Sequence, residues 1–175
     1  MAKELGYRDD PSASSSTATY LASPPTYNSA PPDYEELSSR TVTVRKSVLC
    51  PDATFIIQHR DTGRIVTLVD GELRLCEGYS SRGGFHWQCV TKDRWLGFRN
   101  AVSGTYIGHN DKKKFIANVR HHQSNEHFLE RLNQKGSYEV LVKHGNDLRS
   151  MAIGSDGTSL VETKDEGDLW DFIKV

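Results

Sequence analysis

Three histidines and a glutamate lie close together in residues 121–127, and side chains of these types can hold a metal ion. The segment reads His-His-Gln-Ser-Asn-Glu-His. This spacing differs from the His-Glu-x-x-His pattern that aligns zinc ligands on one face of a helix. We therefore expect a polar loop here, in which one histidine caps the folded body, and neither a metal site nor a cofactor in the chain.

Groups suited to acid–base chemistry include Arg60, His86 and Asp93, but no recognised spacing links a nucleophile, a base and an orienting group. Residues 80–84 are rich in glycine, yet they lack the lysine and the following helix of a phosphate-binding loop. We predict that the protein is not an enzyme and has no catalytic residues. The cysteines form no C-x-x-C pair, which indicates free thiols in a reducing, cytoplasmic setting; they are Cys50, Cys76 and Cys89.

One run of positive charge is a candidate patch for an anionic partner, although a charge run on a hairpin tip is usually a solvated turn. It consists of Lys112, Lys113 and Lys114, with Arg120 nearby in the sequence. The whole chain has 22 basic and 23 acidic residues, a net charge of −1. This balance provides no overall field for nucleic acid, so we expect no specific nucleic-acid partner.

The strongest short motif is P-P-x-Y, which occurs twice near the N-terminus with a spacing of seven residues. Its two copies contain Pro24, Pro25 and Tyr27, and Pro31, Pro32 and Tyr34. Paired prolines favour a polyproline II helix, which loses little chain entropy when it docks on an aromatic groove. The motif resembles the ligand of WW domains, including those of HECT-type ubiquitin ligases. This resemblance implies a WW-domain protein as a partner.

The chain changes character near Arg40. Residues 1–40 contain five of the six prolines, a Ser/Thr-rich stretch and few apolar side chains, so this segment cannot bury enough surface to offset its ordering entropy. We predict a disordered tail over residues 1–40 and one folded domain over residues 41–175. The alternating sequence of residues 41–45 is typical of a strand at the start of that domain. We expect neither a standard signal peptide nor a membrane span.

Short β-rich runs alternate with Gly, Asn and Asp turns from Cys50 to the C-terminus, which predicts an all-β domain. Residues 124–132 are the best helical candidate, and we expect turns there. Three blocks emerge, over residues 55–90, 95–132 and 138–175. Each opens and closes with an aromatic residue: Phe55 and Trp87, Trp95 and Phe128, Tyr138 and Phe172.

Each block also has turn signals at matching positions. A glycine follows each opening aromatic residue, at Gly63, Gly104 and Gly145. Asp70-Gly71 and Asp156-Gly157 are expected to form tight primed hairpin turns. Each block therefore predicts four strands, and three blocks predict twelve strands that close into a barrel with a hairpin cap rather than a propeller. The predicted core includes Phe55, Trp95, Phe128, Leu141, Ile153 and Phe172.

Residues 55–175 resemble a β-trefoil, of the fascin-like or actin-crosslinking type that occurs singly in filamentous fungal proteins. The likeness rests on Trp-Leu-Gly-Phe-Arg-Asn at 95–100, Ser-Gly-Thr-Tyr-Ile-Gly at 103–108 and Trp-Asp-Phe-Ile-Lys-Val at 170–175. The closing strands lack the Gln-x-Trp motif of ricin-type lectins. Actin-bundling fascins carry four trefoils, whereas this chain has room for one.

The sequence therefore predicts an interaction module, with a trefoil for one partner and the P-P-x-Y tail for a WW-domain protein. A carbohydrate-binding trefoil lectin is the first alternative, which exposure of Tyr79, Tyr106 or Trp170 beside a carboxylate would favour. An actin-associated protein is the second alternative, and it rests on the resemblance alone.

Changing both Tyr27 and Tyr34 to Ala should abolish binding to a tandem WW protein, because each tyrosine fills the pocket beside the proline groove. Either single change should weaken tandem binding far more than binding to an isolated WW domain, since linkage through a short spacer raises avidity by about 10² to 10⁴. Calorimetry against single and tandem WW domains measures both effects, with the melting temperature as control. Unchanged affinity after loss of both tyrosines contradicts the prediction.

Overall fold

The computed structural model describes residues 47–79 and 84–175. The P-P-x-Y copies, the rest of the predicted tail and residues 41–45 lie outside the described residues, so the tail boundary stays a prediction. The described part is all-β, as predicted, with twelve strands and one turn of 3-10 helix, η1 (Ser124–Glu126). No helix in this part is both long and apolar enough to cross a membrane.

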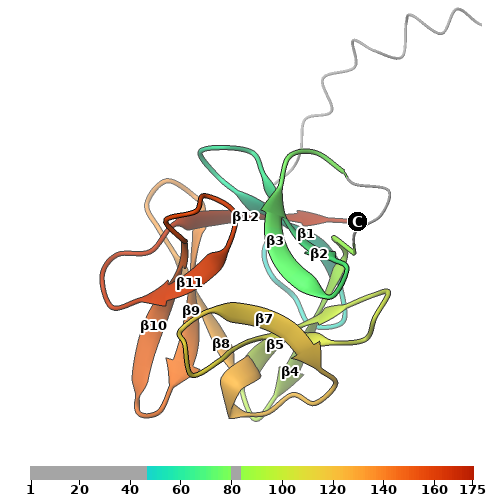
Figure 1. The fold of residues 1–175 in the computed structure, drawn as a ribbon, viewed down its shortest axis with the longest axis vertical. Coiled ribbons are helices and arrows are strands. Elements are labelled where there is room, and N and C mark those ends of the chain that lie inside the picture. Colours follow the sequence, from blue (N-terminus) through green and yellow to red (C-terminus); the bar gives the residue numbers. More distant parts are fainter. Residues whose placement is uncertain (1–46, 80–83) are drawn as a thin grey trace, which may run out of the picture. The chain divides into compact units, whose positions relative to one another are not determined.

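Six strands form a closed antiparallel barrel (Figure 1). Each pairs with the next, and the last returns to pair with the first. Closure leaves this ring without an unpaired edge. In ring order the strands are β1 (Thr54–His59), β4 (Trp87–Lys92), β5 (Trp95–Asn100), β8 (Phe128–Leu132), β9 (Tyr138–His144) and β12 (Leu169–Lys174).

Three hairpins form a cap over one end of this barrel, and Figure 1 shows β3, β7 and β11 arranged around its centre. The hairpins are β2 (Ile65–Val69) with β3 (Glu72–Cys76), β6 (Tyr106–His109) with β7 (Phe115–Val119), and β10 (Asp147–Ile153) with β11 (Leu160–Thr163). They also bond to one another: Leu75 N–H donates to the Thr158 carbonyl over 2.8 Å, and Glu162 N–H donates to the Lys113 carbonyl over 2.9 Å. A six-stranded barrel capped by three hairpins is the predicted β-trefoil.

The strand pairing defines the internal repeat more sharply than the aromatic spacing did. Phe55 pairs with Trp87, Leu96 with Phe128, and Tyr138 with Trp170, and the two members of each pair are 32 residues apart. The second block therefore opens at Leu96 rather than Trp95, and the third closes at Trp170 rather than Phe172. Counting aromatic residues cannot show whether Trp170 or Phe172 closes the third block, because the two residues lie on the same face of one strand.

The core agrees with the prediction at three of its six positions. Phe55, Phe128 and Phe172 have no exposed surface. The other three are only half-buried: Trp95, Leu141 and Ile153.

The alternation of side chains along a strand explains why Leu141 and Trp95 lie outside the core. Leu141 lies between Val140 and Val142, which both face the interior, so its own side chain faces outward. In β5 the interior position belongs to Phe98, whose ring lies 5.4 Å from that of Phe128, centroid to centroid. Trp95 opens the strand and stacks instead on His127 at 5.3 Å.

The predicted turn glycines Gly63, Gly104 and Gly145 adopt φ values of +68°, +73° and +61°, a region that favours glycine. Asp70 and Gly71 both have positive φ, at 50° and 84°, as a primed two-residue turn requires. The second Asp-Gly prediction was wrong in turn type: among its residues, Gly157 has positive φ and Asp156 does not. The loop between β10 and β11 is longer, and the Asp156 carboxylate organises it.

Truncation of Phe128 to Ala should lower the free energy of unfolding by about 3 to 5 kcal/mol, because it leaves a cavity among buried rings. Trp95→Ala is the matched control and should cost only about 1 to 2 kcal/mol, because a half-buried side chain gives up less transfer free energy. Urea unfolding of the two variants measures the difference. Equal losses would contradict the interior position of Phe128.

Candidate functional site

A cavity with a volume of about 370 Å³ lies where the three hairpins of the cap meet. Its walls come from the start of β3, from β7 and from the loop before β11. The lining side chains with charge are Glu72, Arg74, Lys114 and Asp156, and the uncharged polar ones are Asn118, Thr158 and Ser159. The buried side chains of Leu73 and Phe115 add an apolar component. We call this pocket the cap cavity.

Fixed hydrogen bonds hold the carboxylates of the cap cavity in their charged form. Asp156 Oδ1 accepts the Thr158 N–H over 2.9 Å and, from Ser159, the N–H over 2.7 Å and the hydroxyl over 2.9 Å. These bonds, the Ser159 N–H first, lower the pKa of Asp156 to about 2. Arg74 Nε donates to Glu72 over 3.0 Å, and this bond lowers the pKa of Glu72. Both acids therefore remain ionised at neutral pH.

The positive charges of the cap cavity balance these two carboxylates. Arg74 pairs with Glu72, and the Lys114 ammonium lowers the pKa of both Glu72 and Asp156 through its field. The cavity thus combines guanidinium, ammonium and amide donors with carboxylate and hydroxyl acceptors. A set of this kind is suited to a small ligand with several hydroxyl groups, and the volume lies within the usual range of ligand pockets.

The structure divides the predicted anionic-partner patch. Lys112 and Lys113 are exposed on the β6–β7 turn, which the Asn110 side chain organises by accepting the Lys112 and Lys114 N–H groups over 3.0 Å each. Lys114 lines the cap cavity. Arg120 follows the end of β7 and does not line the cap cavity. Binding of an anionic partner by Lys112, Lys113, Lys114 and Arg120 stays a prediction.

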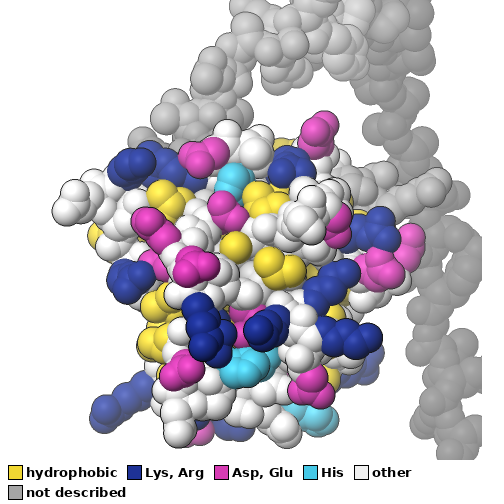
Figure 2. All heavy atoms as spheres, turned by 60° about the vertical axis from the view of Figure 1, so that its left-hand side comes forward, with side chains coloured by type: hydrophobic (Ala, Val, Ile, Leu, Met, Phe, Trp, Pro, Cys, Tyr) yellow, Lys and Arg dark blue, Asp and Glu magenta, His cyan; other side chains and the backbone are white. Residues whose placement is uncertain are grey.

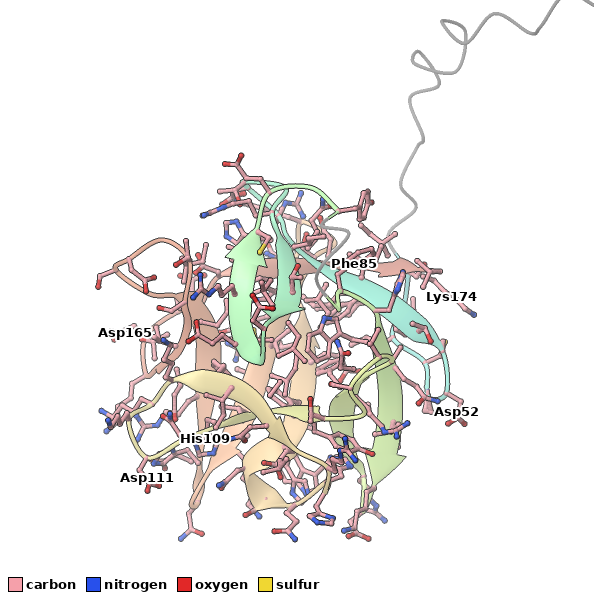
Figure 3. All side chains as sticks on the ribbon, turned by 45° about the vertical axis from the view of Figure 1, so that its right-hand side comes forward. Asp52, Phe85, His109, Asp111, Asp165 and Lys174 are labelled. Carbon is pink, nitrogen blue, oxygen red and sulfur yellow. The ribbon has the colours of Figure 1, made fainter. Side chains whose placement is uncertain are left out.

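The aromatic residues named for a lectin site differ in exposure. Trp170 is fully buried and offers no surface to a ligand. Tyr106 is half-buried and stacks on His122 with a centroid distance of 5.5 Å. Tyr79 is 62% exposed and lies 5.4 Å from the ring of Phe85, which is labelled in Figure 3. Of the three, Tyr79 is the one that presents its ring to solvent.

The histidines of residues 121–127 serve the packing of the loop. His122 is buried, and its Nε2 donates to the Leu96 carbonyl over 3.2 Å. Burial lowers the pKa of His122 and also that of His127. Glu126 is buried as well, and its carboxylate accepts the Gln123 N–H over 3.0 Å. His122 is thus the capping histidine of this loop.

A different trio approaches metal-ligand geometry. The side chains of His109, His144 and Glu162 place their ligand atoms within 4.8 Å of one another. These residues come from three strands in two repeats and have no short sequence spacing. The sequence pattern did not reveal them, because the only local signal was the histidine-rich segment at residues 121–127, where His122 packs the loop instead.

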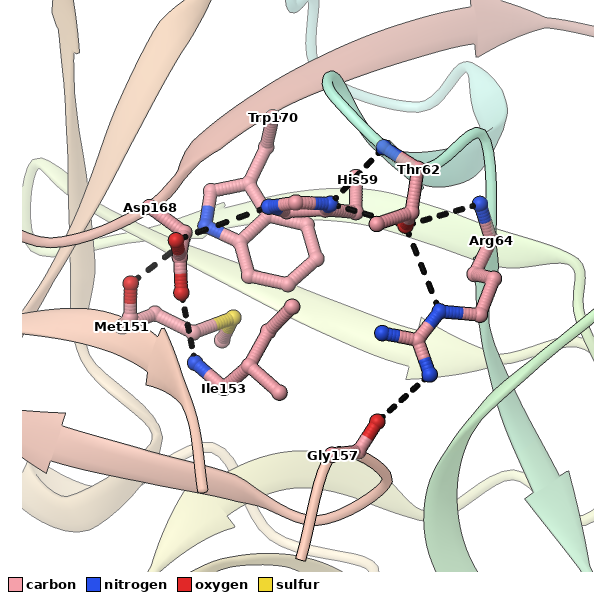
Figure 4. A network of polar contacts seen from close by, with 8 residues as sticks. All are labelled: His59, Thr62, Arg64, Met151, Ile153, Gly157, Asp168 and Trp170. Carbon is pink, nitrogen blue, oxygen red and sulfur yellow. Dashed lines mark hydrogen bonds and ion pairs between the residues drawn. The ribbon is translucent and has the colours of Figure 1, made fainter. Parts of the chain in front are cut away.

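A hydroxyl, an imidazole and a carboxylate also occur in series between the first and third repeats (Figure 4). His59 Nδ1 lies 2.9 Å from Thr62 Oγ1, and His59 Nε2 lies 3.5 Å from Asp168 Oδ1. These are the group types of a hydrolase triad. The Asp168 carboxylate is already engaged, since it accepts the Ile153 N–H over 2.6 Å, and His59 is buried.

None of these three residues lines the cap cavity or the smaller cavity of about 140 Å³ beside residues 119–126. Arg64 extends the same network by donating to Thr62 Oγ1 over 3.3 Å and to the Gly157 carbonyl over 2.5 Å. We therefore interpret the network as a structural link between repeats. The absence of catalytic residues stays a prediction.

The comparisons with known proteins identify the fold. No family model matches the sequence, and no curated protein matches it. Among solved structures, the chain is similar to the Macrolepiota procera ricin B-like lectin in complex with lactose, with 12% identity, a TM-score of 0.58, and coverage of 74% of this chain and 100% of the lectin. It is also similar to the protein described as BEL β-trefoil, with 13% identity, a TM-score of 0.60, and coverage of 74% and 97%.

A third similar structure is the GlcNAcα1-4Gal releasing endo-β-galactosidase from Clostridium perfringens, with 14% identity and a TM-score of 0.60. The match covers 70% of this chain and 32% of the enzyme, so the chain spans about a third of the enzyme's length. At these identities the similarity shows the fold alone. The class of the domain is thus a β-trefoil, whose similar structures include lectins.

The unfolding free energy should fall as the pH drops below 6.5, the usual pKa of histidine, because burial lowers the pKa of His122 in the folded state. The unfolded chain then binds more protons than the folded one. Replacing His122 with Gln, which can still donate to the Leu96 carbonyl, should flatten this dependence. His121→Gln, at the exposed neighbouring position, is the control. Denaturant unfolding between pH 5 and 8 measures the slopes, and equal slopes for the two variants would contradict the prediction.

Proposed function

We propose that the trefoil is a carbohydrate-binding module and that the cap cavity is its ligand site. The observation that supports this proposal is the cavity itself: about 370 Å³ of space lined by side chains that include both hydrogen-bond donors and acceptors. A sugar ring presents hydroxyl groups that both donate and accept, so it can use a guanidinium and a carboxylate at the same time. Loss of such a bond leaves a polar group unpaired, which gives the site its selectivity.

The charge balance of the cap cavity favours a neutral ligand over an anion. Arg74 and Lys114 stand against Glu72 and Asp156, and both carboxylates have a lowered pKa. An anionic ligand would approach two ionised acids and gain little net attraction. The outer surface also mixes positive and negative charges. On the face drawn in Figure 2, Lys and Arg are interspersed with Asp and Glu.

The similar structures support this proposal at the level of ligand class. One of them is a lectin in complex with lactose, and another is an endo-β-galactosidase. Galactosides are therefore the first ligands to test. The missing Gln-x-Trp motif indicates that a site in this chain need not follow the ricin-type arrangement, and the cap cavity provides a separate location.

The broader reading as an interaction module remains part of the proposal. The doubled P-P-x-Y motif supports a WW-domain partner for the tail, and the resemblance to fascin-like trefoils supports actin association. The free thiols of Cys50, Cys76 and Cys89 support a reducing compartment for the protein.

Burial raises the pKa of Cys89 to about 12, so this thiol is unreactive at neutral pH.

A glycan array with the intact chain should give binding to galactose-containing glycans, and calorimetry with lactose should then give the affinity. The double change of Asn118 and Lys114 to Ala should weaken that binding about tenfold, since each lost hydrogen bond costs about 0.5 to 1.5 kcal/mol. Both residues line the cap cavity and are exposed, so the fold should not suffer.

The matched control changes Asn146 and Lys112 to Ala, at exposed positions outside the cap cavity. This control should bind like the unaltered chain. An array with no signal above background removes the carbohydrate proposal. Equal weakening in both double variants would keep carbohydrate binding but move the site away from the cap cavity.

A further inference from the structure

His109, His144 and Glu162 converge where the second repeat meets the third. His109 ends β6, His144 ends β9, and Glu162 belongs to β11. His109 Nδ1 lies 3.1 Å from Glu162 Oε1, and His144 Nδ1 lies 2.9 Å from Glu162 Oε2. We propose that these three side chains bind one zinc ion. Figure 3 labels His109 beside the ribbon of β7.

A hydrogen bond at Nε2 of His109 leaves Nδ1 of the ring available to bind a metal. His109 Nε2 lies 3.0 Å from the Lys143 carbonyl oxygen, which can only accept, so this nitrogen carries the hydrogen. In the neutral ring Nδ1 then presents a lone pair toward Glu162. Metal-binding histidines commonly have this arrangement, in which the outer N–H donates to a backbone carbonyl and fixes the tautomer.

The Glu162 carboxylate needs a positive partner. Its side chain has no exposed surface, and its two ion-pair contacts in the described part of the chain are with His109 and His144. His109 Nδ1 and Glu162 Oε2 also have no hydrogen-bond partner there. His144 Nδ1 also lies 3.2 Å from Glu162 Oε1, a hydrogen-bond contact that leaves Oε2 unpaired. A buried carboxylate with incomplete compensation is costly. A divalent cation between the three groups satisfies the carboxylate and both ring nitrogens at once.

The two imidazole rings also lie close together, with centroids 5.0 Å apart. Both direct Nδ1 at the same carboxylate, so one ion between them can contact all three side chains.

The donor set and the spacing favour zinc. Two imidazole nitrogens and one carboxylate oxygen suit zinc, whereas calcium prefers oxygen ligands throughout. Bonds of about 2.0 to 2.1 Å in a tetrahedron separate the ligand atoms by about 3.3 to 3.4 Å. Glu162 Oε1 lies 3.1 Å from His109 Nδ1 and 3.2 Å from His144 Nδ1, and the three ligand atoms lie within 4.8 Å of one another. The His144 side chain is 35% exposed, which gives the ion a route from solvent.

The full-length chain, first treated with EDTA, is titrated with zinc chloride in a calorimeter, and the melting temperature is followed in parallel. We expect one zinc ion per chain and a rise in melting temperature, because the ion binds the folded state. Calcium chloride should give neither effect. Cobalt(II) should show the visible absorption of a four-coordinate site.

The variants His144→Ala and Glu162→Gln test the ligands. Each should weaken zinc binding by more than the roughly 10- to 100-fold that the loss of an outer-shell partner costs. His144 is partly exposed and Gln has the shape of Glu, so each variant offers a separate route to a folded protein. His121→Ala removes an exposed histidine outside the trio and should bind zinc like the unaltered chain.

Three outcomes overturn the proposal. The unaltered chain takes up no zinc, or a folded His144→Ala variant binds zinc with unchanged affinity, or His121→Ala loses the zinc. The inference does not rest on carbohydrate binding, since the readouts contain no sugar and none of the three ligands lines the cap cavity.

Discussion

Two tryptophans link the cap of this trefoil to its barrel. Trp87 and Trp170 occupy equivalent barrel positions and have no exposed surface. The indole N–H of Trp87 donates to the Val66 carbonyl over 2.9 Å, and that of Trp170 points to the Met151 carbonyl over 3.5 Å. A buried indole without a partner would be costly. Each tryptophan therefore holds one hairpin at a fixed position relative to the barrel. The shape of the cap cavity depends on those positions.

The second repeat has Phe128 at the same barrel position, and a phenyl ring has no N–H to donate. Its hairpin is held by other contacts: Phe115 of β7 packs against Phe128 with centroids 6.0 Å apart, and the Lys113 carbonyl of the β6–β7 turn accepts the Glu162 N–H. The His109, His144 and Glu162 trio lies at this same junction of the second and third repeats. A zinc ion there would link the β6–β7 hairpin, which has no tryptophan hydrogen bond, to β9 and β11, which gives the proposed metal a structural role.

The threefold architecture also explains the mixed chemistry of the cap cavity. Because three hairpins of different sequence converge on one axis, each brings its own side chains to a shared space. The β2–β3 hairpin brings Glu72 and Arg74, the β6–β7 hairpin brings Lys114, and the loop before β11 brings Asp156. The resulting balance of charge belongs to none of the three hairpins alone.

The sequence by itself determined the β class, the three blocks, the turn glycines and three of the core aromatics, because alternation and turn chemistry are local properties. It did not settle which aromatic faces the interior at a strand end, so Trp95 was placed in the core instead of Phe98. Only the tertiary structure brought Glu162 between two histidines 18 and 53 residues before it, and joined three hairpins into a cavity. Those contacts depend on barrel closure and strand register, which connect residues far apart in the chain and leave no pattern of spacing to read.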